Sequence, residues 1–197
     1  MKSLLILISL FASISFAKQL APLSPKLQPL FENLKTVPVN YKPEGAVCEQ
    51  VARLQAFDEF PEDRFAITTG VKYDAGENTI GELDLIVVDK ATRHVELVAE
   101  VKCWRDYGSA MDKAKVQRDR FMWTLTQFPE KIHFESEDPE FQFTEANFHG
   151  LTTFRFISQV GGVRKGFNQE IPYTLSEMSE LREHLVRCQK KGECPLR

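Results

Sequence analysis

Apolar residues recur along this chain with a helical period in some segments and with strand-like character in others. Between residues 46 and 57, Val47, Val51 and Leu54 fall at helical spacing, which predicts a helix. Three apolar stretches follow, and clusters of turn-forming residues separate them. They predict three consecutive strands at residues 65–72, 80–88 and 94–103.

The second half of the chain predicts two more helices and one more strand. A helix capped by Ser109 runs to about residue 127, and a final helix covers residues 174–190. Residues 151–160 read as a fourth strand between them. Residues 130–145 hold six acidic side chains and one lysine, so we expect a solvated loop there. This order of helices and strands predicts a single α/β domain.

The N-terminal residues have the layout of a secretory signal peptide. Lys2 is the lone charge before an uncharged apolar run over residues 4–16, and Ser15 and Ala17 place small residues before a cleavage point. We therefore expect residues 1–17 to be a cleaved signal peptide; the alternative is a retained N-terminal anchor. No second apolar run follows, so the mature protein is expected to have no stable membrane association and to be periplasmic or secreted.

The next segment, residues 18–45, carries five of the ten prolines and reads as an extended arm or linker. A short helix is expected within it, around residues 27–34. The predicted globular domain then covers residues 46–197.

Composition and charge limit the function classes. The chain has 197 residues, of which 43% are hydrophobic and 27% charged, and this balance is typical of a globular protein. The formal net charge of −3 excludes a basic nucleic-acid coat protein. Any nucleic-acid contact therefore needs a local basic surface, and residues 102–120 hold six basic and three acidic side chains.

The predicted export favours disulfide bonds among the four cysteines, because exported chains meet an oxidising environment. Cys188 and Cys194 flank a turn-like stretch and can close a small loop, which leaves Cys48 and Cys103 as the other pair. Four cysteines allow three pairings, and the sequence alone does not choose among them. No C-x-x-C motif supports a zinc ribbon or a thioredoxin-like site.

Charged side chains interrupt the second and third predicted strands. Asp84 lies in the second strand, and Glu100 and Lys102 lie in the third. Because side chains alternate faces along a strand and the two strands should pair, these three can converge on one sheet surface. Two carboxylates suit a hard cation such as Mg²⁺, and a lysine can orient an attacking water molecule. The alternative is an exposed aspartate beside a cross-strand ion pair.

Asp84 followed by Glu100-Val101-Lys102 resembles the PD-(D/E)xK nuclease superfamily, especially its small bacterial Holliday-junction-resolvase-like members. The resemblance covers about residues 44–125, and Leu83 stands where the name-giving proline would be. It implies a restriction-endonuclease-like fold, with a mixed central sheet flanked by helices. It also implies that Asp84, Glu100 and the Val101 carbonyl hold Mg²⁺ or Mn²⁺ and that Lys102 orients the water.

Two further residues enter the candidate site through the same resemblance. Glu49 lies on the helix before the strands, where a glutamate often completes the metal site in this superfamily. Gln117, four residues before Phe121, resembles the Gln-x-x-x-Tyr element of the exonuclease-like branch and can steady the lysine or the substrate. The alternatives are a solvated Glu49 and a glutamine at the edge of the core.

These observations predict an exported Mg²⁺-dependent deoxyribonuclease whose partner is nucleic acid, with a homodimer left open. A non-catalytic nucleic-acid-binding module of the same fold is the alternative from another class. A third alternative is an exported nuclease toxin, which would have a cognate immunity protein. No nucleophile elbow, H-E-x-x-H motif, Walker A motif or dinucleotide fingerprint supports another catalytic class.

Overall fold

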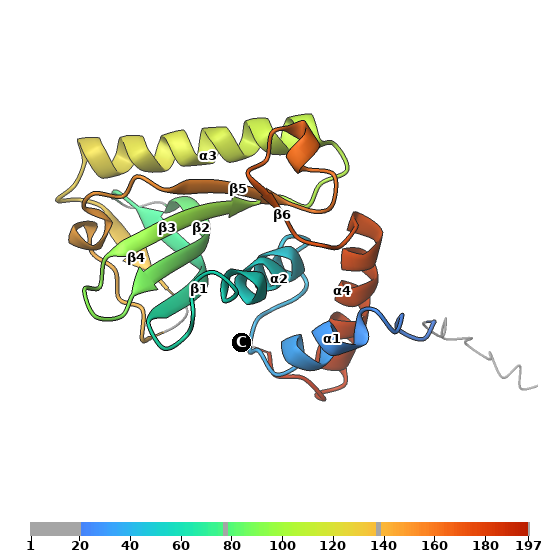
Figure 1. Ribbon diagram of the computed structural model, residues 1–197. Coiled ribbons are helices and arrows are strands. Elements are labelled where there is room, and N and C mark those ends of the chain that lie inside the picture. Colours follow the sequence, from blue (N-terminus) through green and yellow to red (C-terminus); the bar gives the residue numbers. More distant parts are fainter. Residues whose placement is uncertain (1–20, 77–78, 137–138, 197) are drawn as a thin grey trace, which may run out of the picture.

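The computed structural model describes residues 21–76, 79–136 and 139–196 and shows an α/β architecture with an open, mixed six-stranded sheet (Figure 1). The strand order is β4-β1-β2-β3-β5-β6. The strands are β1 Phe65–Asp74, β2 Thr79–Asp89, β3 Val95–Val101, β4 His133–Glu135, β5 Phe154–Ser158 and β6 Gln169–Glu170. The meander β1-β2-β3 is antiparallel, whereas β5 runs parallel to β3 and β6 parallel to β5.

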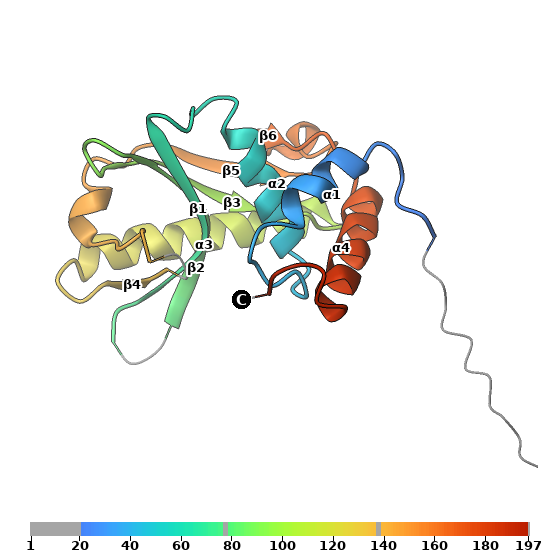
Figure 2. The same ribbon diagram turned by 90° about the horizontal axis from the view of Figure 1, so that it is seen from below.

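Helices cover both faces of this sheet (Figures 1 and 2). The long helix α3, Tyr107–Gln127, lies along one face, and α2, Ala46–Ala56, lies on the other. Beyond α2 lie α1, Gln28–Leu34, and α4, Leu175–Lys190. Strand alternation explains the two layers, because Leu85 and Val87 join the core beneath α2 while Ile86 and Val88 join the core beneath α3.

The three-strand meander, the fourth strand and the four helices are confirmed, with small shifts in their ends. The Ser109 cap is wrong, because Asp106 caps α3 by accepting from the backbone N–H groups of Gly108 (2.9 Å) and Ser109 (3.4 Å). The prediction of a solvated loop over residues 130–145 is also wrong in part. Strand β4 pairs there with β1, and Phe141 and Phe143 are buried in the core.

The proline-rich segment packs against the rest of the protein from Leu23 onward. Leu27, Leu30 and Leu34 of α1 are buried in the same core as α2 and α4. Tyr41 is fully buried, and its hydroxyl group donates to the Leu34 carbonyl at 2.8 Å. The predicted signal peptide, residues 1–17, lies outside the described residues. None of the described helices is long and apolar enough to cross a membrane.

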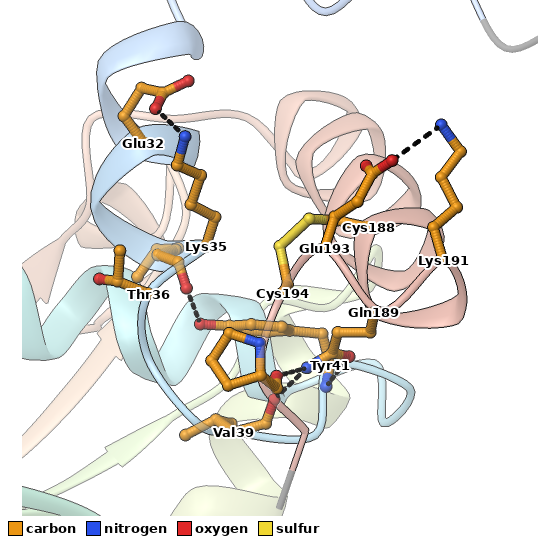
Figure 3. Close-up of a disulfide and its surroundings, with 12 residues drawn as sticks. Glu32, Lys35, Thr36, Val39, Tyr41, Cys188, Gln189, Lys191, Glu193 and Cys194 are labelled. Carbon is orange, nitrogen blue, oxygen red and sulfur yellow. Dashed lines mark hydrogen bonds and ion pairs between the residues drawn. A yellow bond between two sulfur atoms is a disulfide. The ribbon is translucent and has the colours of Figure 1, made fainter.

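All four cysteines form disulfides, as is typical of an exported protein. Cys48 pairs with Cys103, and Cys188 pairs with Cys194. The first bond joins α2 to the end of β3. The second closes a short loop after α4 and lies beside the segment that contains Val39 and Tyr41 (Figure 3).

Candidate carboxylate and lysine site

Asp84, Glu100 and Lys102 meet because β2 and β3 pair directly. Leu85 lies opposite Ala99, and this register places Asp84 beside the end of β3. Asp84 Oδ2 accepts from the Val101 backbone N–H at 2.8 Å and contacts the Lys102 ammonium group. The same ammonium group lies 3.0 Å from Glu100 Oε2. One lysine therefore bridges two carboxylates on neighbouring strands.

The backbone at Lys102 is held by β5. Its N–H donates to the Ile157 carbonyl at 2.9 Å, and its carbonyl accepts from the Ser158 hydroxyl group at 2.7 Å. Ser158 is fully buried, so this support lies inside the core. The lysine side chain therefore extends from a rigid strand end rather than from a loop.

Burial governs the electrostatics of this group. The exposed fractions are 5% for Asp84, 0% for Glu100 and 8% for Lys102. Burial, followed by the neighbouring Asp84 charge, raises the pKa of Glu100 to about 8, against the lowering effect of Lys102. Burial acts to lower the pKa of Lys102, but Asp84 and Glu100 together outweigh it, so the lysine pKa lies above its ordinary value.

A cleft of about 640 Å³ opens beside this group. Asp84 lines it, together with Glu49 from α2, Glu82 from β2 and Gln117 from α3. Glu100 and Lys102 are not among its lining residues, and the Lys102 ammonium group links them to Asp84, which is. The structure thus brings Glu49 and Gln117 to the same cleft as Asp84, although four different elements carry the residues of the site.

Glu49 lies among other acids in the first turn of α2. Burial is the largest cause that raises its pKa, and the charges of Asp84, Glu82 and Glu100 raise it further while Lys102 lowers it. This setting differs from a solvated helix surface, which was the alternative for this residue. Gln117 is half-buried, and its Oε1 atom is buried without a hydrogen-bond partner in the described structure.

Two further residues line the cleft that were not expected at the site. Glu82 lies two residues before Asp84 on β2, and strand alternation, which places both on one face, was the available signal. Gly70 of β1 lines the cleft near Asp84 with a φ of +68°, and a Cβ atom there would lie 3.3 Å from Glu82 Oε1. A glycine inside a strand pattern indicates such a close approach.

One wall of the cleft comes from the proline-rich segment, which no sequence argument placed near the site. Residues 36–40 and Pro43 form this wall. Gln189 of α4 holds it, because its Nε2 atom donates to the Val39 carbonyl at 2.6 Å and its Oε1 atom accepts from the Tyr41 N–H at 3.3 Å (Figure 3). Arg182 adds a bond to the Tyr41 carbonyl at 3.2 Å.

The donor atoms fit a hard divalent cation in type. Four carboxylates gather here, and Glu100 Oε1 is buried without a hydrogen-bond partner in the described structure. In the arrangement seen, however, no three Asp, Glu, His or Cys side chains of the described residues lie close enough to hold a metal ion. The Lys102 ammonium group bridges Asp84 and Glu100 instead, and the Val101 N–H is bound to Asp84. A cation that contacts both Asp84 and Glu100 would therefore compete with this ammonium group.

Residues that follow the site in sequence differ in whether they are free to contact nucleic acid. Trp104, two residues after Lys102, is 42% exposed. The Tyr107 hydroxyl group, in contrast, donates to the Val160 carbonyl at 2.6 Å. The glycine-rich turn at 161–166 uses two of its amides internally, because Glu170 accepts from Gly161 (2.9 Å) and Val163 (3.1 Å). These amides are therefore not available to a phosphate group.

In comparisons with known proteins, no family model matches this chain, and neither a curated protein nor a solved structure matches it.

Proposed function

We propose that this protein is an exported nuclease that hydrolyses phosphodiester bonds, with DNA as its substrate, using Mg²⁺ or Mn²⁺ on a restriction-endonuclease-like fold. The observation that carries the proposal is the bridge from Lys102 to Asp84 and Glu100 beside a cleft that also displays Glu49. Buried acids of this kind are costly to keep without a purpose. The two disulfides support the exported setting.

In this proposal each residue of the site has its own role in hydrolysis. A divalent cation held by Asp84, Glu100 and Glu49 supplies Lewis acidity toward a phosphate oxygen. Lys102 has a raised pKa, so it is an ammonium group at neutral pH and serves as a hydrogen-bond donor to the attacking water and to developing negative charge. Gln117, with an unpaired buried Oε1 atom, is placed to orient a group in the cleft.

Basic side chains around the cleft support a phosphate-bearing substrate. Arg53 and Lys72 line the cleft itself. On α3, Lys113 and Arg120 flank Gln117 at helical spacing, so all three share one side of the helix. Local positive charge of this kind can attract a polyanion to a protein whose formal net charge is −3.

A nuclease assay tests the proposal. Purified protein lacking residues 1–17 is incubated with supercoiled, linear and single-stranded DNA in the presence of Mg²⁺, Mn²⁺ or EDTA. Asp84→Ala and Lys102→Ala are compared with Asp58→Ala, a matched substitution of an exposed acid. We expect cleavage that requires the cation and disappears in the first two variants only. Absence of cleavage of DNA, and of RNA added as a control, by folded protein would contradict the proposal and favour a binding module.

A further inference from the structure

The Cys48–Cys103 disulfide joins the two chain segments that carry the site. Cys48 directly precedes Glu49 on α2, and Cys103 directly follows Lys102 after β3. The other disulfide, Cys188–Cys194, lies within the C-terminal segment and touches neither α2 nor the sheet covalently. A single covalent bond therefore ties the helix with Glu49 to the strand with Glu100.

Glu49 lies at the cleft together with other acids of the site. It lines the cleft with Asp84 and Glu82, although it is carried by α2 and they are carried by β2. The position of Glu49 relative to these acids is therefore set by how the first turn of α2 lies against the sheet.

Apolar packing and the disulfide together hold the first turn of α2. Ala46, Val47 and Cys48 of this turn are buried in the core. The N-cap residue, Gly45, makes no side-chain capping bond. The disulfide therefore adds a covalent link to the sheet side of the site directly beside Glu49, and its release should loosen the position of that side chain.

We propose that the Cys48–Cys103 disulfide is a positioning element that holds Glu49 at the carboxylate site, so that tight cation binding requires the oxidised protein. The inference rests on the proposed function in one respect, namely that the cleft carboxylates bind a divalent cation. The cation affinity of the site then depends on the redox state of the compartment. The site binds a cation weakly in a reducing cytoplasm and tightly after the disulfide has formed.

The bond is accessible to a thiol reductant. Cys103 is half-buried, and both cysteines line a second cavity of about 440 Å³ together with the exposed Trp104. A thiolate attacks Cys103 Sγ, forms a mixed disulfide and releases the Cys48 thiolate, which takes up a proton. A second thiolate resolves the mixed disulfide, so that two electrons pass from two thiols to the protein and leave two cysteine thiols and one oxidised reagent.

Calorimetric titration with Mn²⁺ tests the inference without measuring catalysis. Cys48→Ser/Cys103→Ser should weaken Mn²⁺ binding about tenfold or more relative to the oxidised wild type, the range found when groups that orient metal ligands are removed. The matched pair Cys188→Ser/Cys194→Ser, which leaves Cys48–Cys103 intact, should bind Mn²⁺ within about twofold of the wild type, because the inference assigns no positioning role to the second disulfide. Treatment of the wild type with dithiothreitol should reproduce the effect of the first pair. Equal Mn²⁺ affinity in Cys48→Ser/Cys103→Ser and in the wild type would overturn the inference.

Glu49→Gln separates positioning of Glu49 from general bracing of the fold. If the disulfide acts through Glu49, then removing the disulfide from the Glu49→Gln protein should cause no further loss of Mn²⁺ affinity. Should Cys48→Ser/Cys103→Ser fail to fold by circular dichroism, Glu49→Gln in the oxidised protein still tests the inference. This substitution should weaken Mn²⁺ binding about tenfold or more. Mn²⁺ affinity equal to that of the wild type would show that Glu49 is not held at the site and would overturn the inference.

The titration also distinguishes this inference from the proposed function. An oxidised wild type that binds no Mn²⁺ contradicts the proposed function and the inference with it. A wild type that binds Mn²⁺ and cleaves DNA, beside a disulfide-free variant that does both equally well, overturns the inference alone.

Discussion

The Lys102 ammonium nitrogen lies 3.0 Å from Glu100 Oε2, and one residue separates the two in the chain at the end of β3. The same ammonium group contacts Asp84, so it occupies the space between two carboxylates. A cation that binds both acids must compete with this lysine. Under the proposed function, Lys102 should therefore weaken cation binding while it assists catalysis.

Lys102→Met should bind Mn²⁺ at least as tightly as the wild type, because the competing ammonium group is gone. Its DNA cleavage should fall about 100-fold or more, which is the usual scale for losing a group that assists proton transfer or charge stabilisation. Calorimetric titration and a cleavage assay on the same samples measure both effects. Lys131→Met, at an exposed lysine, is the control. Cleavage at the wild-type rate by Lys102→Met would rule out the assigned role.

The metal-free protein should lose stability as the pH rises from about 5 to 8. The pKa of Glu100 is about 8 in the folded protein, above its ordinary value of 4.5, so the folded state binds the proton more tightly. This contribution to stability is fully present below the unfolded-state pKa and disappears as the pH passes through the folded-state pKa.

Urea unfolding in EDTA across this pH range measures that loss. Glu100→Gln should show a flatter pH dependence, whereas Glu96→Gln, at an exposed position of the same strand, should follow the wild type. A pH profile of Glu100→Gln identical to that of the wild type would show that Glu100 is not the titrating group.

Asp89 should give a pH dependence of opposite sign. Hydrogen bonds from the Thr92 backbone and then from Arg64 lower the pKa of Asp89 to about 2, below its ordinary value of 3.8. The stability that Asp89 contributes is present above the unfolded-state pKa and is lost as the pH falls through the folded-state value. Asp89→Ala should therefore be less stable than the wild type at pH 6, and the difference should shrink toward pH 2.5. Urea unfolding of both proteins, with Asp58→Ala as control, provides the comparison.

Gln189→Ala should loosen the cleft wall formed by residues 36–40 and Pro43. The substitution removes the bonds to the Val39 carbonyl and the Tyr41 N–H, and also a 2.9 Å bond to the Pro195 carbonyl. We expect a loss of stability of about 1–2 kcal/mol. The KM for DNA should rise severalfold with a smaller change in kcat, because the wall borders the cleft without supplying a charged group. Gln28→Ala, at an exposed glutamine, is the control. An unchanged KM in Gln189→Ala would show that the wall takes no part in substrate binding.

The two disulfides should contribute unequally to stability. Cys48–Cys103 spans 55 residues and Cys188–Cys194 spans six, so loop-closure entropy predicts about 4 and about 2 kcal/mol respectively. Reduction of the intact protein should first raise its mass by about four hydrogens, as measured without alkylation. Unfolding free energies of the two serine double variants then give the ranking, and a larger loss from the Cys188–Cys194 pair would contradict the entropic account.

Local patterns were enough to predict the three-strand meander and the meeting of Asp84, Glu100 and Lys102. Strand alternation and a tight turn are local properties, and together they limit which side chains of neighbouring strands can face each other. Helices α2 and α4 were predictable for the same reason, since helical spacing and capping residues are read within a few turns.

Tertiary structure alone decided the rest. Strand β4 has three residues and owes its existence to pairing with the distant β1, so its own sequence carried no adequate signal. The choice among three disulfide pairings, the arrival of Glu49 and Gln117 at one cleft, and the use of residues 36–40 as its wall depend on contacts between segments far apart in sequence. Hydrophobic periodicity states which face of an element is buried, but the partner of that face is selected only when the whole core packs.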